Sequence, residues 1–167
     1  MRGMSQRLAL VIVLVAGLLI ALSAPANAAA TNQISGTAEF GGSPECAAPP
    51  AEFNSYPPLV MDGSLVGCWY THIDTARTTA GGVYLESGEE LFVGSLNGGP
   101  AGTFTTTYKF EAKLNPAGSE IRGRCQHKIV AENGTGGFEG ASGRVDFKDI
   151  IGATTITYEY RGHIRLA

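Results

Sequence analysis

Long segments in which apolar and polar residues alternate are the feature that most constrains the fold of this chain. One segment has a mostly apolar and aromatic set at every second position, namely Phe104, Thr106, Tyr108, Phe110, Ala112 and Leu114. Lysine, glutamate and threonine occupy the positions between them. The same alternation recurs near the C-terminus, at Ile156, Tyr158, Tyr160, Gly162, Ile164 and Leu166. Because successive side chains of a strand point to opposite faces, each segment predicts a strand with one face in the core and the other in water.

Candidate strands account for most of the chain. They are rich in Thr, Tyr, Phe, Val and Ile and are separated by clusters of Gly, Asn and Pro, which are typical of turns between antiparallel strands. Their ranges are 31–40, 65–74, 83–94, 102–114, 120–132, 143–150 and 154–166. Helical periodicity is limited to a short stretch at 136–141. Long strands without covering helices leave sheet edges open unless the sheet closes, so we expect an all-β fold: a closed antiparallel barrel of about eight strands, with a β-sandwich as the alternative.

The N-terminus is typical of a secretory signal peptide. Arg2 and Arg7 precede an apolar run at 8–22, and an Ala-Asn-Ala site ends at Ala28. The run is shorter than the roughly 18 residues that a membrane-spanning helix needs. We therefore expect cleavage after Ala28, secretion to an extracellular compartment and no association with a membrane after cleavage. The predicted organisation is a signal peptide at 1–28, an N-terminal strand and a Pro- and Gly-rich loop at 29–58 that belong to the domain, and the main barrel at 59–167.

Charge and cysteine content narrow the classes of partner. The predicted signal peptide contains two of the 12 Lys and Arg and none of the 15 Asp and Glu, so the remaining chain has 10 basic and 15 acidic residues and a net charge of −5. Such a chain has no basic stripe for phosphates, and nucleic acid is not an expected partner. Cys46, Cys68 and Cys125 predict one disulfide and one free thiol in an oxidising compartment, with all three pairings open. Paired CxxC motifs are absent from the sequence, so neither a metal nor a cofactor is expected.

A glycine-rich turn near the C-terminus resembles a known family. Residues 134–147 read Gly-Thr-Gly-Gly-Phe-Glu-Gly-Ala-Ser-Gly-Arg-Val-Asp-Phe, and a last strand follows at 158–166. This stretch is similar to the C-terminal part of the allene oxide cyclase barrel group, which includes the dirigent proteins, and is closest to small exported bacterial proteins of this group. The resemblance implies a barrel whose cavity shapes the chemistry, and assembly into a homo-oligomer. The glycines permit a compact turn, in which Phe138 and Ala141 can plug the end of the barrel.

Several polar and aromatic residues are predicted to point into the barrel. The candidate ligand-binding residues are Tyr70, Phe92, Tyr108, Tyr158 and Tyr160. Glu90 and His127 are the candidate catalytic pair, because a carboxylate and an imidazole in one apolar cavity can act as acid and base. The alternative interpretation is that both are buried polar groups hydrogen-bonded to neighbours.

Two further orientations follow from the same assignment. If Cys68, Tyr70 and His72 point inward, Trp69 points outward and can mark a protein contact together with the Pro-rich loop. Asp149 belongs to a mixed-charge patch that we expect to be solvated.

Three functions remain open from the sequence. The first is a secreted barrel that binds a small apolar ligand or is purely structural. The second is a cyclase or isomerase acting on an apolar substrate in the barrel interior, and the third is a surface module that binds a protein partner. A role without catalysis ranks before an enzymatic one.

Overall fold

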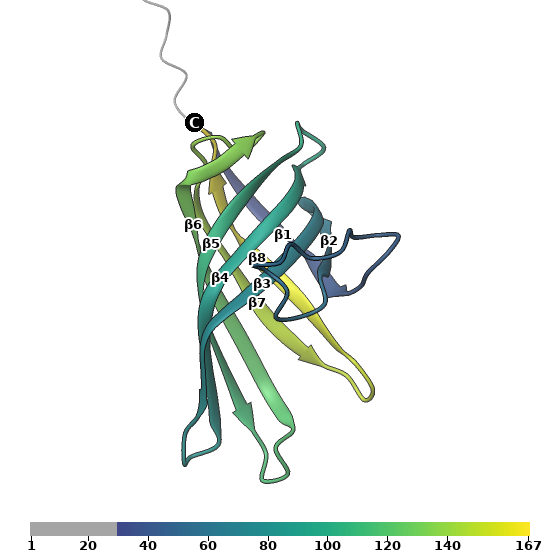
Figure 1. Ribbon diagram of the computed structural model, residues 1–167, viewed down its shortest axis with the longest axis vertical. Coiled ribbons are helices and arrows are strands. Elements are labelled where there is room, and N and C mark those ends of the chain that lie inside the picture. Colours follow the sequence, from purple (N-terminus) through teal and green to yellow (C-terminus); the bar gives the residue numbers. More distant parts are fainter. Residues whose placement is uncertain (1–29) are drawn as a thin grey trace, which may run out of the picture.

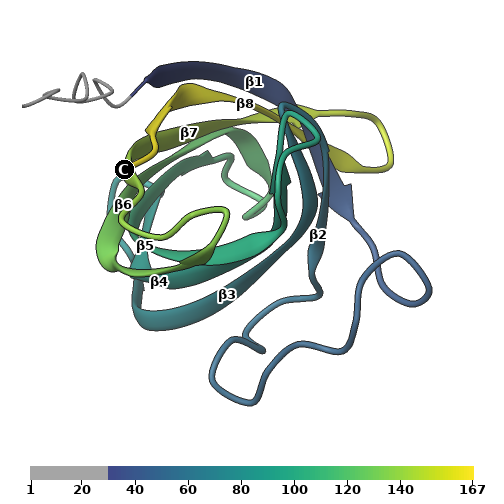
Figure 2. The same cartoon turned by 90° about the horizontal axis from the view of Figure 1, so that it is seen from above.

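The computed structural model describes residues 30–167, which form a closed antiparallel barrel of eight strands (Figures 1 and 2). The signal peptide predicted at 1–28 lies outside the described residues. Each strand pairs with the next one in sequence, and the last strand pairs with the first. The strands are β1 (Thr31–Phe40), β2 (Leu59–Gly63), β3 (Leu65–Thr78), β4 (Val83–Leu96), β5 (Gly102–Leu114), β6 (Glu120–Gly136), β7 (Ser142–Ile151) and β8 (Ile156–Arg165).

The predicted fold class is confirmed, since residues 30–167 contain strands, turns and loops but no α-helix. Accordingly, none of these residues belongs to a helix long and apolar enough to cross a membrane. The β-sandwich alternative is wrong, because β1 and β8 pair along eight residues and close the sheet. The sequence did not separate the short strand β2, which bridges β1 and β3.

One end of the barrel is plugged by side chains from the glycine-rich turn between β6 and β7. Phe138 and Ala141 are fully buried there. The ring of Phe138 packs against Phe92 and Phe104, with centroid distances of 5.6 and 5.0 Å. Gly140 has a φ of +66°, a left-handed conformation that other residues rarely adopt. This plugged end lies at the top of Figure 1, and the β3–β4, β5–β6 and β7–β8 hairpins extend toward the opposite end.

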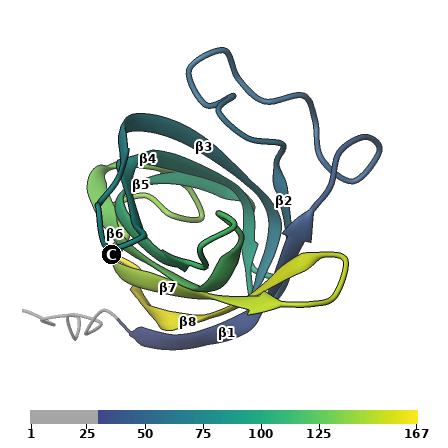
Figure 3. The same cartoon turned by 90° about the horizontal axis from the view of Figure 1, so that it is seen from below.

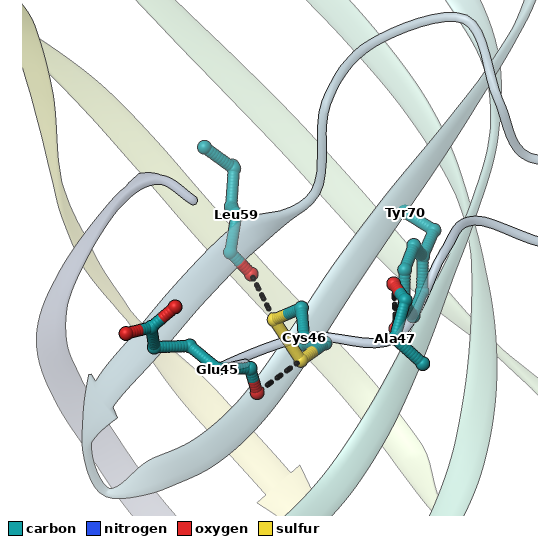
Figure 4. The surroundings of a disulfide bond; sticks show 6 residues. Glu45, Cys46, Ala47, Leu59 and Tyr70 are labelled. Carbon is teal, nitrogen blue, oxygen red and sulfur yellow. Dashed lines mark hydrogen bonds between the residues drawn. A yellow bond between two sulfur atoms is a disulfide. The ribbon is translucent and has the colours of Figure 1, made fainter. Parts of the chain in front are cut away.

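The loop at 41–58 lies outside the barrel, against the outer face of β3 (Figure 3). The disulfide joins Cys46 of this loop to Cys68 of β3, which settles the pairing left open by the sequence, and Cys125 is a buried free thiol. Beside the disulfide, the Tyr70 hydroxyl donates a hydrogen bond to the Ala47 carbonyl at 3.3 Å (Figure 4). Loop and strand thus enclose a small second cluster of apolar residues, separate from the barrel interior.

The predicted orientation of the β3 side chains is wrong. Trp69 is only 1% exposed and packs in the barrel interior against Phe92 and Phe104, whereas Cys68 and Tyr70 face outward beneath the loop. His72, also expected inside, is about half-exposed. The cause is the loop, because it buries the outer face of β3 as well. Residues 68–71 are consequently buried without interruption, so this segment lacks the alternation that marks inside and outside.

Candidate functional site

The barrel interior contains a cavity of about 310 Å³ between the plugged end and the open end. Residues from all eight strands line the cavity, together with Tyr56 of the 41–58 loop. They combine aromatic rings with carboxyl groups. The lining residues are Phe40, Tyr56, Leu59, Trp69, Thr71, Tyr84, Glu86, Glu90, Tyr108, Phe110, Ala112, Leu114, Glu120, Cys125, His127, Phe147, Asp149 and Tyr158.

Glu90 and His127 meet in this cavity, as the sequence predicted. Glu90 Oε2 lies 2.5 Å from His127 Nε2, and the two side chains are 8% and 3% exposed. His127 Nδ1 lies 3.0 Å from the Val145 carbonyl oxygen, which can only accept, so Nδ1 carries a hydrogen. Glu90 Oε2 and His127 Nε2 are in ion-pair contact, while this carboxyl oxygen has no hydrogen bond within residues 30–167. Thr71 donates to the other Glu90 oxygen at 2.9 Å. The pairing is shown; a catalytic role for it stays a prediction.

Glu86 is a second buried carboxylate, which the sequence analysis did not select. It accepts hydrogen bonds from the hydroxyls of Tyr56, Tyr84 and Tyr108 at 2.7, 2.6 and 2.7 Å. Burial and the neighbouring Glu86 charge raise the pKa of Tyr108 far above its ordinary value, so the hydroxyl remains a donor. The sequence does contain a pattern that could have selected Glu86, because Glu86 lies four residues before Glu90 and therefore on the same face of β4.

Glu120 and Asp149 form a third acidic group, near the open end of the barrel. The two carboxyls are hydrogen-bonded to each other, and burial first and Glu120 second raise the pKa of Asp149 to about 8. Gly123 makes room for them, because a Cβ there would lie 2.3 Å from an oxygen of each carboxyl. The expectation that Asp149 is solvated is wrong, since it continues the inward series of Val145 and Phe147 on β7.

This raised pKa predicts how stability depends on pH. The unfolded chain releases the Asp149 proton near pH 3.8, whereas the folded protein holds this proton up to about pH 8. The folded state thus binds the proton more tightly, and the stability that this group contributes is lost as the pH rises from 3.8 to 8. We expect Asp149→Asn, which mimics the protonated carboxyl, to become progressively more stable relative to wild type over this range.

The measurement is denaturant unfolding of wild type and Asp149→Asn at pH 5 and at pH 8.5. Asp146→Asn is the control, because Asp146 lies on the outer face of the same strand beside Arg144. A stability difference between wild type and Asp149→Asn that is independent of pH would contradict the assignment.

The five predicted ligand-binding residues occupy three different places. Tyr108 and Tyr158 line the cavity. Phe92 and Tyr160 belong to the packed interior of the barrel but do not line the cavity. The Tyr160 hydroxyl instead accepts a hydrogen bond from the Leu65 amide at 2.8 Å. Tyr70 lies outside the barrel, so its predicted inward orientation is wrong.

Cys125 lines the cavity as a thiol, not as a thiolate. Burial raises its pKa well above the ordinary value, and the charge of Glu90 adds to the effect. A protonated thiol is a poor nucleophile. The polar chemistry of the cavity therefore lies with its carboxyls, its tyrosines and His127.

Comparison of the chain with protein-family models, with curated proteins and with solved structures finds no match. The resemblance to the allene oxide cyclase group therefore stays a prediction. Fold and site together define the class of protein: a closed eight-stranded antiparallel barrel with an aromatic, carboxyl-lined cavity in its interior.

Proposed function

We propose that this protein is a secreted barrel that binds a small, largely apolar molecule in its interior. The cavity of about 310 Å³ is the observation that supports the proposal. Ligand sites are typically concave, mostly apolar and about 300 to 1,000 Å³ in volume, with a few polar groups that orient the ligand. The Cys46–Cys68 disulfide is consistent with an extracellular location, where such bonds persist.

The uneven packing of the interior favours ligand binding over a purely structural role. Toward the plugged end, Phe92, Phe104 and Phe138 interlock with ring centroids 5.0 to 5.6 Å apart and have no exposed surface. Toward the open end, rings such as Phe110 and Tyr158 are only partly buried and border the cavity. Since protein interiors are otherwise closely packed, an unfilled region of this size in one barrel supports a ligand site.

Trp69 provides the test, because it is the single tryptophan of the chain and lines the cavity. We expect the neutral probe N-phenyl-1-naphthylamine to bind the purified protein and to accept excitation energy from Trp69. Ala112→Phe places a ring in the cavity wall and is expected to weaken binding at least about tenfold, because a filled site leaves no room for the probe.

The matched control is Ala76→Phe, which adds the same ring at an exposed position. Melting temperatures of both variants show whether the barrel remains folded. Equal affinity in wild type, Ala112→Phe and Ala76→Phe, or no binding to any of them, would contradict a cavity ligand.

A cyclase or isomerase is the second candidate, favoured by the Glu90–His127 contact. A buried carboxylate in contact with an imidazole can take a proton from one ligand atom and return it to another. The Nδ1 hydrogen bond to Val145 fixes the orientation of the imidazole, as such chemistry requires.

Proton exchange offers a test that does not require the natural substrate. We expect the protein to speed deuterium uptake at the carbons beside the carbonyl of cyclohexanone in D2O, followed by proton NMR. Glu90→Gln should lose about 100-fold of that acceleration if the pair is the general base. Glu89→Gln, one residue away on the outer face, is the control. A wild-type rate equal to that of buffer alone would count against this candidate.

The third candidate, a protein-binding surface module, loses one of the two features on which it depended and keeps the other, the Pro-rich loop on the outside of the barrel. Trp69 is buried inside the barrel and is not available to a partner.

A further inference from the structure

The cavity is acidic, and the three carboxyl sites within it are compensated to different degrees. Glu86 receives three tyrosine hydroxyls, and Glu90 is paired with His127. Glu120 and Asp149 have only each other and at most one proton between them. Among the described residues, no lysine or arginine lines the cavity. The interior therefore has an excess of negative charge that the barrel does not neutralise.

Asp149 is one of the cavity side chains with a buried polar atom that lacks a hydrogen-bond partner. It is 7% exposed and lines the cavity, yet its Oδ1 has no hydrogen-bond partner among residues 30–167. Glu120 Oε1 is buried without a partner as well. A buried carboxyl oxygen without a donor is costly, and such atoms in folded proteins are normally satisfied. A donor or a positive charge from a ligand would satisfy both oxygens.

Aromatic rings lie beside the same carboxyl pair and in the cavity wall. Tyr158 is the direct cross-strand neighbour of Asp149, and Phe40 packs edge-on against Tyr158 with ring centroids 5.6 Å apart. Tyr84 and Phe110 form a second such pair at 6.1 Å in the cavity wall. Faces of aromatic rings attract cations, and rings next to a carboxylate form the usual environment of bound ammonium groups.

From this arrangement we infer that the ligand is an organic cation, a protonated or quaternary amine on an apolar body, whose charge lies beside Glu120 and Asp149. The inference rests on the proposed function and narrows it to one chemical class. The same charges exclude carboxylates and phosphates, because an anion would enter a cavity that already holds uncompensated negative charge and offers no lysine or arginine among its described lining residues.

Three small probes of similar size separate charge from shape. They are phenyltrimethylammonium, its neutral isostere tert-butylbenzene and the anion 4-tert-butylbenzoate. Quenching of Trp69 fluorescence and isothermal titration calorimetry measure their affinities for the full chain with its disulfide intact. We expect the cation to bind about tenfold tighter than the neutral isostere, and the anion to bind more weakly than either.

Two isosteric variants locate the charge. The double variant Asp149→Asn/Glu120→Gln keeps the size of both side chains but removes the negative charge of the pair, so it should abolish the preference for the cation. The single variant Asp149→Asn replaces the protonated member of the pair, leaves the charge on Glu120 and should keep the preference. Glu159→Gln, an exposed residue on β8, is the matched control and should keep the preference. Melting temperatures confirm that each variant is folded.

The outcomes distinguish this inference from the function on which it rests. Equal binding of cation and isostere, tighter binding of the anion, or a cation preference that survives the double variant would overturn the organic-cation ligand and leave the binding barrel in place. Failure of all three probes together with N-phenyl-1-naphthylamine would overturn both.

Discussion

Replacement of Trp69 by alanine is expected to lower the free energy of unfolding by about 3 to 5 kcal/mol. The indole is 1% exposed and contacts Phe92, Phe104 and Phe147, with ring centroids between 5.2 and 6.0 Å. Its removal exchanges these contacts for an enlarged cavity that the surrounding sheet cannot collapse to fill. Denaturant unfolding followed by far-ultraviolet circular dichroism measures the change, since the variant has no tryptophan to report by fluorescence.

Val66→Ala is the control for this experiment. Val66 lies on the outer face of the same strand and is 50% exposed, so its truncation should change stability by no more than about 0.5 kcal/mol. If the two variants were destabilised equally, Trp69 would not be a core residue and the orientation of β3 would have to be reversed.

Removal of the disulfide in the double variant Cys46→Ala/Cys68→Ala is expected to cost about 3 kcal/mol. The bond closes a chain segment with a sequence separation of 22 residues, and its loss releases that constraint on the unfolded chain. The part of the loop around Cys46 should also separate more readily from β3, because beside the disulfide it is held by the Tyr70–Ala47 hydrogen bond, whereas Ser55 remains hydrogen-bonded to Thr71 and Ile73 at the other end of the loop. Limited proteolysis within the loop should therefore be faster in the double variant.

Cys125→Ala serves as the comparison, since it removes a buried thiol and leaves the disulfide intact. Its loop should resist proteolysis as the wild type does. A thiol count under denaturing conditions gives one free cysteine in the wild type. After reduction, the double variant has two cysteines fewer in total than the wild type. Unchanged stability and unchanged loop cleavage in the double variant would show that the disulfide does not anchor the loop.

The alternating segments explain why much of the interior was predictable. On β5 and β8 one face meets water, so Tyr108 and Tyr158 could be assigned to the interior from their positions alone, and the structure places both at the cavity. The same rule placed Glu90 and His127 together, because both belong to the inward-facing set of alternating residues on the two strands that flank β5. The same rule also applies to Glu86 and Asp149, which point to the same side of their strands as Glu90 and Phe147. Acidic residues are commonly solvated, however, so alternation alone was no reason to bury them.

The orientation of β3 could not be derived in this way. An inward Trp69 and an outward Tyr70 are both buried, one by the barrel and the other by the loop, and a strand covered on both faces has no alternation to follow. The cover comes from residues 41–58, whose position depends on the Cys46–Cys68 bond and therefore on a pairing that spacing does not determine.

The sequence by itself determined the all-β class and the faces of its regularly alternating strands, because these depend on local periodicity. It favoured a closed sheet over a sandwich through the need to pair every long edge, and the β1–β8 pairing settled that choice. The tertiary structure decided the disulfide, the face of Trp69, the position of the loop and the three carboxyl sites of the cavity. Each of these depends on contacts between residues far apart in the chain, such as Glu120 with Asp149 and Glu86 with Tyr56. Local pattern fixes which way a side chain points, whereas only the closed barrel fixes what it meets there.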